Sequence, residues 1–146
     1  MTASSTTTPT LRIRKAAVLG AGVMGAQIAA HLANAGVETL LFDLPAKDGD
    51  KNGIVNKAIA NLAKLSPSPL AEKSRVAAIT AANYDDNLEA LRGCDLVIEA
   101  IAERMDWKLD LYKRIAPYLS DSAVVASNTS GLSINALAVA LPPALR

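Results

Sequence analysis

Three closely spaced glycines constrain the fold of this chain more than any other feature of its sequence. Gly20, Gly22 and Gly25 follow an apolar run at residues 16–19 and accompany the start of a helical pattern at residues 23–35. A continuous apolar run of this length is typical of a strand that is covered on both faces. Because glycine has no Cβ atom, these positions allow a tight turn and close packing of the helix on the sheet. The sequence therefore predicts a strand, a turn and a helix in direct succession.

The rest of the chain alternates apolar runs and helical patterns in the same way. Further strands are predicted at residues 37–42, 81–84, 95–100 and 123–126, and further helices at residues 51–64, 71–79, 105–118 and from Ser133 onward. Pro69 is well placed to begin the helix at 71–79. Since crossovers between parallel strands are almost always right-handed, this order predicts an α/β fold of the Rossmann type. Its sheet should be doubly wound and mostly parallel, with helices on both faces.

Composition and charge exclude several classes of protein. Fifteen Lys and Arg against 14 Asp and Glu leave a net charge of +1, which does not favour a nucleic-acid or membrane-surface partner. The single cysteine, Cys94, cannot form an internal disulfide, and no Cys/His cluster has the spacing of a metal site. No apolar run approaches the ~20 residues that cross a bilayer. We expect residues 1–12 to be a flexible N-terminal lead and residues 13–146 to form one metal-free, cytoplasmic domain.

An acidic residue beyond the glycines adds a second signal. Asp43 ends the predicted second strand, 18 residues after Gly25, near the position where dinucleotide-binding domains place the acid that binds the adenosine ribose. A carboxylate there repels a 2′-phosphate, and neither Leu44 nor Pro45 supplies an arginine to bind one, so NAD is preferred over NADP. FAD shares the pattern and stays a less favoured alternative. The pyrophosphate is expected on the backbone amides of the glycine loop, formed by Gly20, Ala21, Gly22, Val23, Met24 and Gly25.

Three motifs together resemble the NAD-binding domain of the 3-hydroxyacyl-CoA dehydrogenases. They are VLGAGVMG at residues 18–25, VIEAIAE at 97–103 and SNTS at 127–130, and the resemblance spans about residues 13–141. It implies NAD-dependent oxidation of (S)-3-hydroxyacyl-CoA to 3-oxoacyl-CoA in fatty acid β-oxidation, with an acyl-CoA as substrate. In such a reaction the cofactor accepts the hydride and the protein orients it.

The resemblance also implies roles for individual residues near the ends of two predicted strands. Glu103 and Lys108 would lie beside the cofactor, and Asn128 near the nicotinamide ribose. Ser130 would hydrogen-bond the 3-hydroxyl of the substrate. Loops at the carboxyl ends of parallel strands meet at one edge of the sheet, which suits these assignments. As an alternative, Glu99 could bind a backbone amide at the strand end, although we favour Glu103 as the cofactor contact.

Two lysines of the predicted helix at 51–64 are candidate substrate contacts. Lys64 matches the family position that reaches the CoA phosphates, and Lys57 lies one helical stripe away. An ordinary solvated helix face is the alternative for both. The segment at 128–130 likewise has an alternative role, as a turn that caps the helix from Ser133. Trp107 is expected to pack in the core.

The general base of the family is not found in this sequence. In the family a His held by a Glu removes the hydroxyl proton, and its segment should follow shortly after Pro142 and Pro143, whereas the sequence ends at Arg146. His31 lies in the helix behind the glycine loop and is expected to be structural. We expect this chain alone to be inactive, and a homodimer only with the C-terminal helical domain. A non-catalytic NAD(H)-binding regulatory module, or another hydroxyacid dehydrogenase, stays open.

Overall fold

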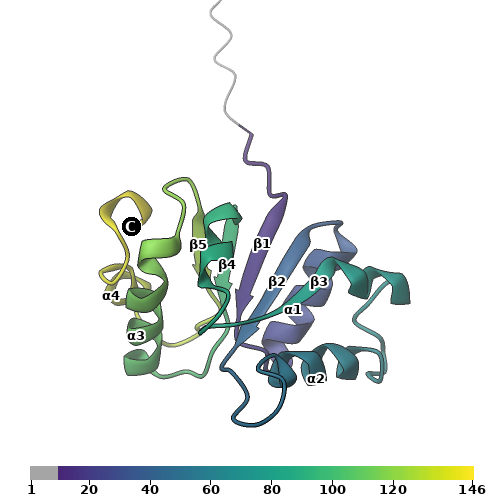
Figure 1. The fold of residues 1–146 in the computed structure, drawn as a ribbon. Coiled ribbons are helices and arrows are strands. Elements are labelled where there is room, and N and C mark those ends of the chain that lie inside the picture. The colour runs from purple at the N-terminus through teal and green to yellow at the C-terminus, as the bar shows by residue number, and fades with distance from the viewer. Residues whose placement is uncertain (1–9) are drawn as a thin grey trace, which may run out of the picture.

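Five parallel strands form one sheet in the computed structural model, which describes residues 10–146. The sheet order is β3-β2-β1-β4-β5 (Figure 1). The strands are β1 (Lys15–Leu19), β2 (Glu38–Asp43), β3 (Ile79–Asn83), β4 (Leu96–Glu99) and β5 (Val124–Ser127). All five predicted strands are confirmed, each end within two residues of its expected position. Residues 1–9 of the expected flexible lead lie outside the described residues.

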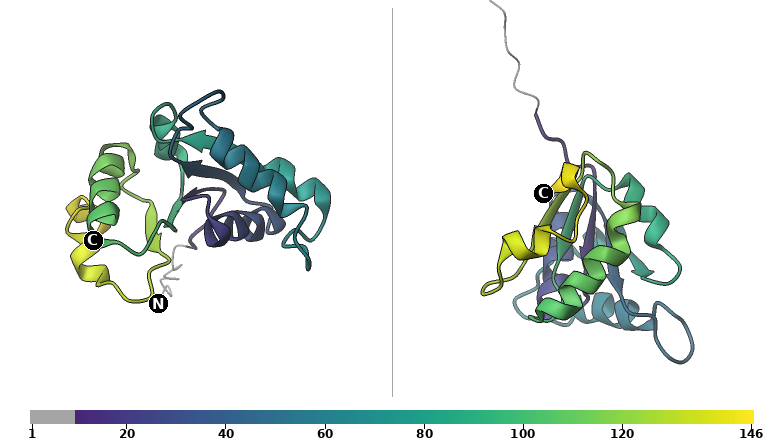
Figure 2. Two further views of the ribbon diagram at one scale, coloured as in Figure 1. Left: turned by 90° about the horizontal axis from the view of Figure 1, so that it is seen from below. Right: turned by 90° about the vertical axis from the view of Figure 1, so that its left-hand side faces the viewer.

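Helices cover both faces of the sheet (Figure 2). The α-helices are α1 (Val23–Asn34), α2 (Gly53–Leu62), α3 (Met105–Ile115) and α4 (Ile134–Ala138). Short 3₁₀ segments are η1 (Lys73–Ala78), η2 (Leu88–Gly93), η3 (Ala116–Tyr118) and η4 (Pro143–Leu145). Helices α1 and α2 pack on one face, and α3 and α4 on the other. This arrangement confirms the predicted Rossmann-type, doubly wound α/β fold. Among residues 10–146, none of the helices has the length and apolar character needed to cross a bilayer.

The central strands are buried on both faces, as their continuous apolar sequence predicts. Val18 and Leu41 pack toward α1 and α2, whereas Leu19 and Phe42 pack toward α3. Helix α1 faces the sheet with four buried alanines, which allow its backbone to lie close to the strands; they are Ala26, Ala29, Ala30 and Ala33. Because β1 is flanked by β2 on one side and β4 on the other, the chain reverses its direction across the sheet there. Ligands of such sheets bind at this reversal, beyond the carboxyl ends of the strands.

The predicted helix at residues 71–79 is wrong. The segment forms the 3₁₀ helix η1, and Ile79 begins β3. Pro69 begins no helix, and its carbonyl accepts a hydrogen bond from the Asn34 side chain at 2.8 Å. The Ala71 amide donates to the same side chain at 2.9 Å. These two long-range bonds attach the start of the segment to the end of α1, so tertiary contacts accompany the departure from the local helical pattern.

Because the central strands are buried, a Leu→Ala substitution in a strand should lower the free energy of unfolding much more than the same substitution at an exposed position. Leu41→Ala should lower the free energy of unfolding by about 2–5 kcal/mol, because Leu41 is fully buried and its truncation leaves a cavity. Leu11→Ala should change it by less than about 0.5 kcal/mol, since Leu11 is 60% exposed. Urea denaturation followed by circular dichroism measures both values. Equal losses for the two variants would contradict the described packing.

Candidate cofactor-binding site

The glycine loop joins β1 to α1 at the point where the sheet order reverses. Gly20 has φ +109°, and a Cβ atom there would lie 2.6 Å from the Ala100 carbonyl oxygen. A Cβ atom on Gly25 would overlap the carbonyl oxygen of Gly20. A Cβ atom on Gly22 would meet no described atom within 4 Å. Gly20 and Gly25 are therefore needed for the turn and the close helix packing, whereas Gly22 borders open space. The predicted tight turn and close packing are confirmed.

The first turn of α1 is suited to an anion. Gly22 occupies the N-cap position, so no capping side chain covers the first-turn amides there, and no acidic residue of the described chain lies in that turn. Val23 is 75% exposed and Met24 54% exposed, which leaves this helix end open to solvent. Unpaired N–H groups and the positive end of the helix dipole favour a phosphate. The loop therefore fits the pyrophosphate of a dinucleotide.

Asp43 lies beside this loop at the end of β2. Its Oδ2 accepts a hydrogen bond from the Ala21 amide at 2.7 Å, and its Oδ1 one from the Leu44 amide at 2.7 Å. The Gly20 amide donates to the Phe42 carbonyl at 2.8 Å, which brings the two strand ends together. A carboxylate has about four acceptor positions, so Asp43 keeps capacity for the hydroxyls of a ribose. The structure thus places the predicted acid in contact with the predicted loop.

A cleft of about 560 Å³ opens over these residues. Gly20, Gly22 and Asp43 line one part of it, and the loop after β4 and the exposed side of α3 line the rest. The cleft also borders Tyr84, which stacks on Phe42 with the ring centroids 5.9 Å apart. Burial raises the pKa of Tyr84 far above its usual range, and the negative charge of Asp43 adds to this effect.

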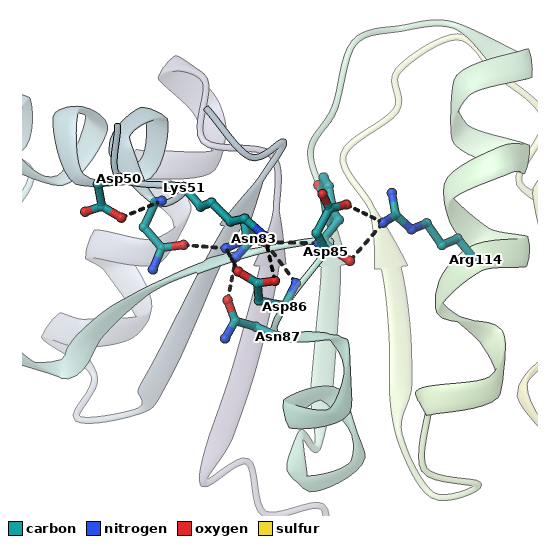
Figure 3. A network of polar contacts seen from close by, with 9 residues as sticks. Asp50, Lys51, Asn83, Asp85, Asp86, Asn87 and Arg114 are labelled. Atoms are coloured by element: carbon teal, nitrogen blue, oxygen red, sulfur yellow. Dashed lines mark hydrogen bonds and ion pairs between the residues drawn. The ribbon is translucent and has the colours of Figure 1, made fainter. Parts of the chain in front are cut away.

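A network of polar contacts joins the end of β3 and the loop after it to the loop before α2 and to α3 (Figure 3). Arg114 of α3 lines the cleft, and its Nη2 donates to Asp85 Oδ1 at 2.8 Å and to the Tyr84 carbonyl at 3.0 Å. Asn83 is buried and donates to Asn52 Oδ1 at 2.8 Å. Arg114 is the one arginine among the cleft-lining residues described, and it pairs with Asp85 at the surface of the cleft.

A buried ion pair lies beneath the loop that follows β4. Glu99 Oε2 accepts from Lys108 Nζ at 2.6 Å, and both side chains are at most 1% exposed. Glu99 also accepts from the Ile101 amide at 2.8 Å, from the Ser127 hydroxyl at 2.7 Å and from the Tyr112 hydroxyl at 3.4 Å. Burial raises the pKa of Tyr112 to about 12, and the charge of Glu99 contributes. The alternative in which Glu99 binds a backbone amide is confirmed.

Lys108 therefore lies in the core, where its ammonium group also contacts the Ile101 carbonyl at 3.3 Å. A direct contact with the cofactor stays a prediction for this residue. What the structure describes is a lysine that fixes the backbone of the cleft wall through Glu99 and Ile101. A buried charge of this kind is stabilised only when its partners satisfy it, and here carboxylate and carbonyl oxygens do so.

The loops after β4 and β5 are joined at the same edge of the sheet. Thr129 Oγ1 donates to Glu103, and the Thr129 amide donates to the Ser127 hydroxyl at 3.1 Å. Asn128 and Ser130 flank Thr129 and are exposed. Helix α4 is capped by Ser133, whose Oγ accepts from the Ala136 amide at 3.2 Å, so residues 128–130 are not its cap. The structure therefore brings the segment with Asn128 and Ser130 next to Glu103.

A second cleft, of about 360 Å³, lies between α1 and α2. It shares Ala21, Gly22 and Val23 with the glycine loop, and Lys57 lines it from α2. Lys64 is exposed beyond the end of α2 and does not line this cleft. The structure thus brings Lys57, but not Lys64, beside the predicted pyrophosphate site.

The sequence-based predictions did not assign several residues of α3 to the first cleft. The prediction that Trp107 packs in the core is wrong, because its side chain is 49% exposed and lines the first cleft. Asp110 and Arg114 line the same cleft, three and seven residues further along α3. That helical spacing was a signal for a shared face, but the sequence alone did not show that this face borders a cleft. His31 is exposed in the last turn of α1 and lines neither cleft.

Comparison with known proteins agrees with this geometry. Residues 15–144 match the family model described as 3-hydroxyacyl-CoA dehydrogenase, NAD binding domain. The chain belongs to this family. NAD is thereby identified as its cofactor, in agreement with the glycine loop and Asp43.

Relatives of this NAD-binding domain include longer proteins. It is 47% identical over 131 residues to a putative fatty acid oxidation complex trifunctional enzyme of Rickettsia felis, covering 89% of this chain and 18% of the relative. It is 39% identical over 126 residues to a probable 3-hydroxyacyl-CoA dehydrogenase of Deinococcus radiodurans, covering 86% of this chain and 36% of the relative. Among solved structures, a 3-hydroxybutyryl-CoA dehydrogenase from Escherichia coli matches with a TM-score of 0.74 and 28% identity, over 92% of this chain and 28% of that one.

Two glycine substitutions should separate folding from cofactor binding. Gly25→Ala should destabilise the domain, because its Cβ atom would overlap the Gly20 carbonyl. Gly22→Ala should cost about 1 kcal/mol of stability or less, since its Cβ atom meets no described neighbour, yet weaken NADH binding by filling the space a pyrophosphate needs. Thermal unfolding and calorimetric titration measure the two effects. A Gly22→Ala domain with unchanged NADH affinity would contradict the loop assignment.

Removal of the Asp43 carboxylate should weaken NADH binding and reduce the ratio of the NADH affinity to the NADPH affinity. Asp43→Ala should reduce NADH affinity by about 10- to 150-fold, because a hydrogen bond to a charged group contributes about 1.5–3 kcal/mol. NADPH affinity should fall less, since the substitution also removes the repulsion of its 2′-phosphate. Asp121→Ala, an exposed carboxylate that lines neither cleft, is the matched control. Equal affinity of the wild type and Asp43→Ala for NADH would remove Asp43 from the site.

Proposed function

We propose that this domain supplies the NAD site of an enzyme that oxidises (S)-3-hydroxyacyl-CoA to 3-oxoacyl-CoA in fatty acid β-oxidation. The observation that most supports this is the junction of the loops after β4 and β5. Thr129 connects Glu103 to the segment of Asn128 and Ser130 at the edge where the glycine loop lies. The named relatives agree, since they include hydroxyacyl-CoA dehydrogenases and a fatty acid oxidation complex enzyme.

The residues of this chain divide into groups by the part of the ligand they would bind. NAD, when bound, accepts the hydride from the substrate carbon. The amides of the glycine loop would hold its pyrophosphate, and Asp43 would accept the ribose hydroxyls. Glu103 and Asn128 would orient the nicotinamide end, and Ser130 would hydrogen-bond the 3-hydroxyl. The Glu99–Lys108 pair would keep these loops at a constant separation, because it is bonded to Ile101 on one side and Ser127 on the other.

Lys57 is the stronger candidate for contact with the CoA phosphates. Lys57 lines the cleft that also contains Gly22 and Val23, so a polyphosphate bound there would lie close to the cofactor. Lys64 would add a second, more distant positive charge at the exposed end of α2. An ammonium group is a compact charge that suits phosphates.

Turnover would require groups that the described clefts do not contain. The single histidine of the sequence, His31, lines neither cleft. This chain spans 18% and 36% of the length of the two curated relatives compared above. We propose that the His–Glu pair and any dimer contact belong to further polypeptide, and that this domain alone binds NAD(H) without oxidising an acyl-CoA.

The cytoplasmic location of the protein also stays a prediction.

Titration of the chain with NADH and coenzyme A tests this function. NADH should bind, coenzyme A should bind more weakly, and acetoacetyl-CoA should not be reduced. Lys57→Glu should weaken coenzyme A binding by about tenfold, through loss of a favourable charge and gain of a repulsive one, and weaken NADH binding by a smaller factor, because Lys57 lies beside the proposed pyrophosphate site. Lys73→Glu, an exposed lysine of η1 that lines neither cleft, is the control. NADH binding with no affinity for coenzyme A would favour a regulatory module, and a folded chain that does not bind NADH would overturn the proposal.

A further inference from the structure

Trp107 is the single tryptophan of the chain, and it lies half-exposed on the first turn of α3. Its side chain lines the cleft that contains the glycine loop and Asp43. An aromatic ring of this size has about 150–250 Å² to bury, and one that stays in contact with water next to a cleft has an apolar surface available for a ligand. The function proposed so far uses none of this surface.

The orientation of the indole ring is held by its neighbours. The Arg104 guanidinium lies over the ring at 4.2 Å from its centroid. Arg104 is in turn held by Asp106, with its Nε 3.2 Å from Oδ1 and its Nη2 2.8 Å from Oδ2. A two-point contact of this kind restricts the guanidinium plane, and the guanidinium attracts the face of the ring electrostatically. One face of Trp107 is therefore covered by a positioned cation, which limits the rotation of the side chain.

The rest of the cleft indicates which part of NAD meets Trp107. The pyrophosphate lies at the glycine loop and the adenosine ribose at Asp43, so the adenine follows Asp43 along the cleft. The apolar side chains that line the same cleft include Leu44, which follows Asp43 in the chain, Ile101 and Trp107. These side chains are apolar, as the faces of a purine require, and Trp107 is the planar one among them.

We propose that Trp107 stacks on the adenine of NAD and that Arg104, held by Asp106, positions the ring. The proposal rests on the NAD site described above. Stacking of a base on an aromatic side chain contributes about 1–3 kcal/mol per base, as judged by alanine substitution. A guanidinium on the opposite face of the indole does not hinder such stacking, because an aromatic ring has two faces.

Binding of NADH and of ADP-ribose to Trp107 variants tests the proposal. ADP-ribose contains the adenine but no nicotinamide, so both ligands should lose the same factor in Trp107→Ala, about 5- to 150-fold. Trp107→Phe should retain most of the affinity, because phenylalanine keeps an aromatic face. Trp107→Leu should remain weak, since it keeps apolar volume without that face. Arg104→Ala should cause a smaller loss, about two- to fivefold. Val124→Ala, an exposed apolar residue that lines neither cleft, should bind like the wild type.

Fluorescence gives a second readout that a merely structural role would not change. Because Trp107 is the single tryptophan, its emission should change when ADP-ribose binds to the wild type, and no energy transfer to a nicotinamide contributes to that signal. Equal affinities of Trp107→Ala and wild type, or an emission that ADP-ribose does not alter, would overturn the stacking assignment while leaving the NAD site intact. A wild-type domain that binds neither NADH nor ADP-ribose would instead overturn the function proposed above. Trp107→Leu with the affinity of Trp107→Phe would also contradict stacking.

Discussion

The close approach of α1 to the end of β1 determines the geometry of the rest of this site. Gly25 lies so near the Gly20 carbonyl that a single added methyl group would overlap it. This approach brings the first turn of α1 directly over the edge of the sheet, where its amides face solvent. It also brings Ala21 within hydrogen-bond distance of Asp43. A wider turn would separate the first-turn amides from the Asp43 carboxylate, and the proposal that both bind one dinucleotide depends on their closeness.

The other side of the site depends on a buried charge. Glu99 is the last residue of β4 and has no exposed surface. Its buried negative charge is stabilised by hydrogen bonds from the ammonium, hydroxyl and amide groups that surround it. Those partners belong to α3, β5 and the loop after β4, so satisfying one carboxylate fixes three segments relative to one another. Removal of one partner of such a pair is costly, because the remaining charge is left without compensation. We interpret this network as the support for the exposed residues Glu103, Asn128 and Ser130, none of which is held by the apolar core.

Helix α3 has two functions in this arrangement. Its buried face, with Leu111, Tyr112 and Ile115, packs on the sheet and contributes to the core. Its cleft side has Trp107 and Arg114, and Leu111 belongs to both sides, because it is buried in the core and also lines the cleft. Packing and the cleft lining thus use adjacent stripes of the same helix, so the core fixes the position of the cleft-lining residues.

The sequence by itself determined the order of the strands along the chain, the glycine turn, the acidic residue Asp43 at the end of the second strand and the motifs of the family, because each depends on residues close together in the chain. Local patterns also suggested an α-helix at 71–79, whereas the structure has a 3₁₀ segment preceded by hydrogen bonds to Asn34. Only the tertiary structure showed that Lys108 is buried against Glu99, that Thr129 joins Glu103, and that Trp107 faces the cleft instead of the core. A helical pattern shows which residues share a face. Which face meets the sheet and which meets the ligand depends on how α3 crosses strands distant in sequence.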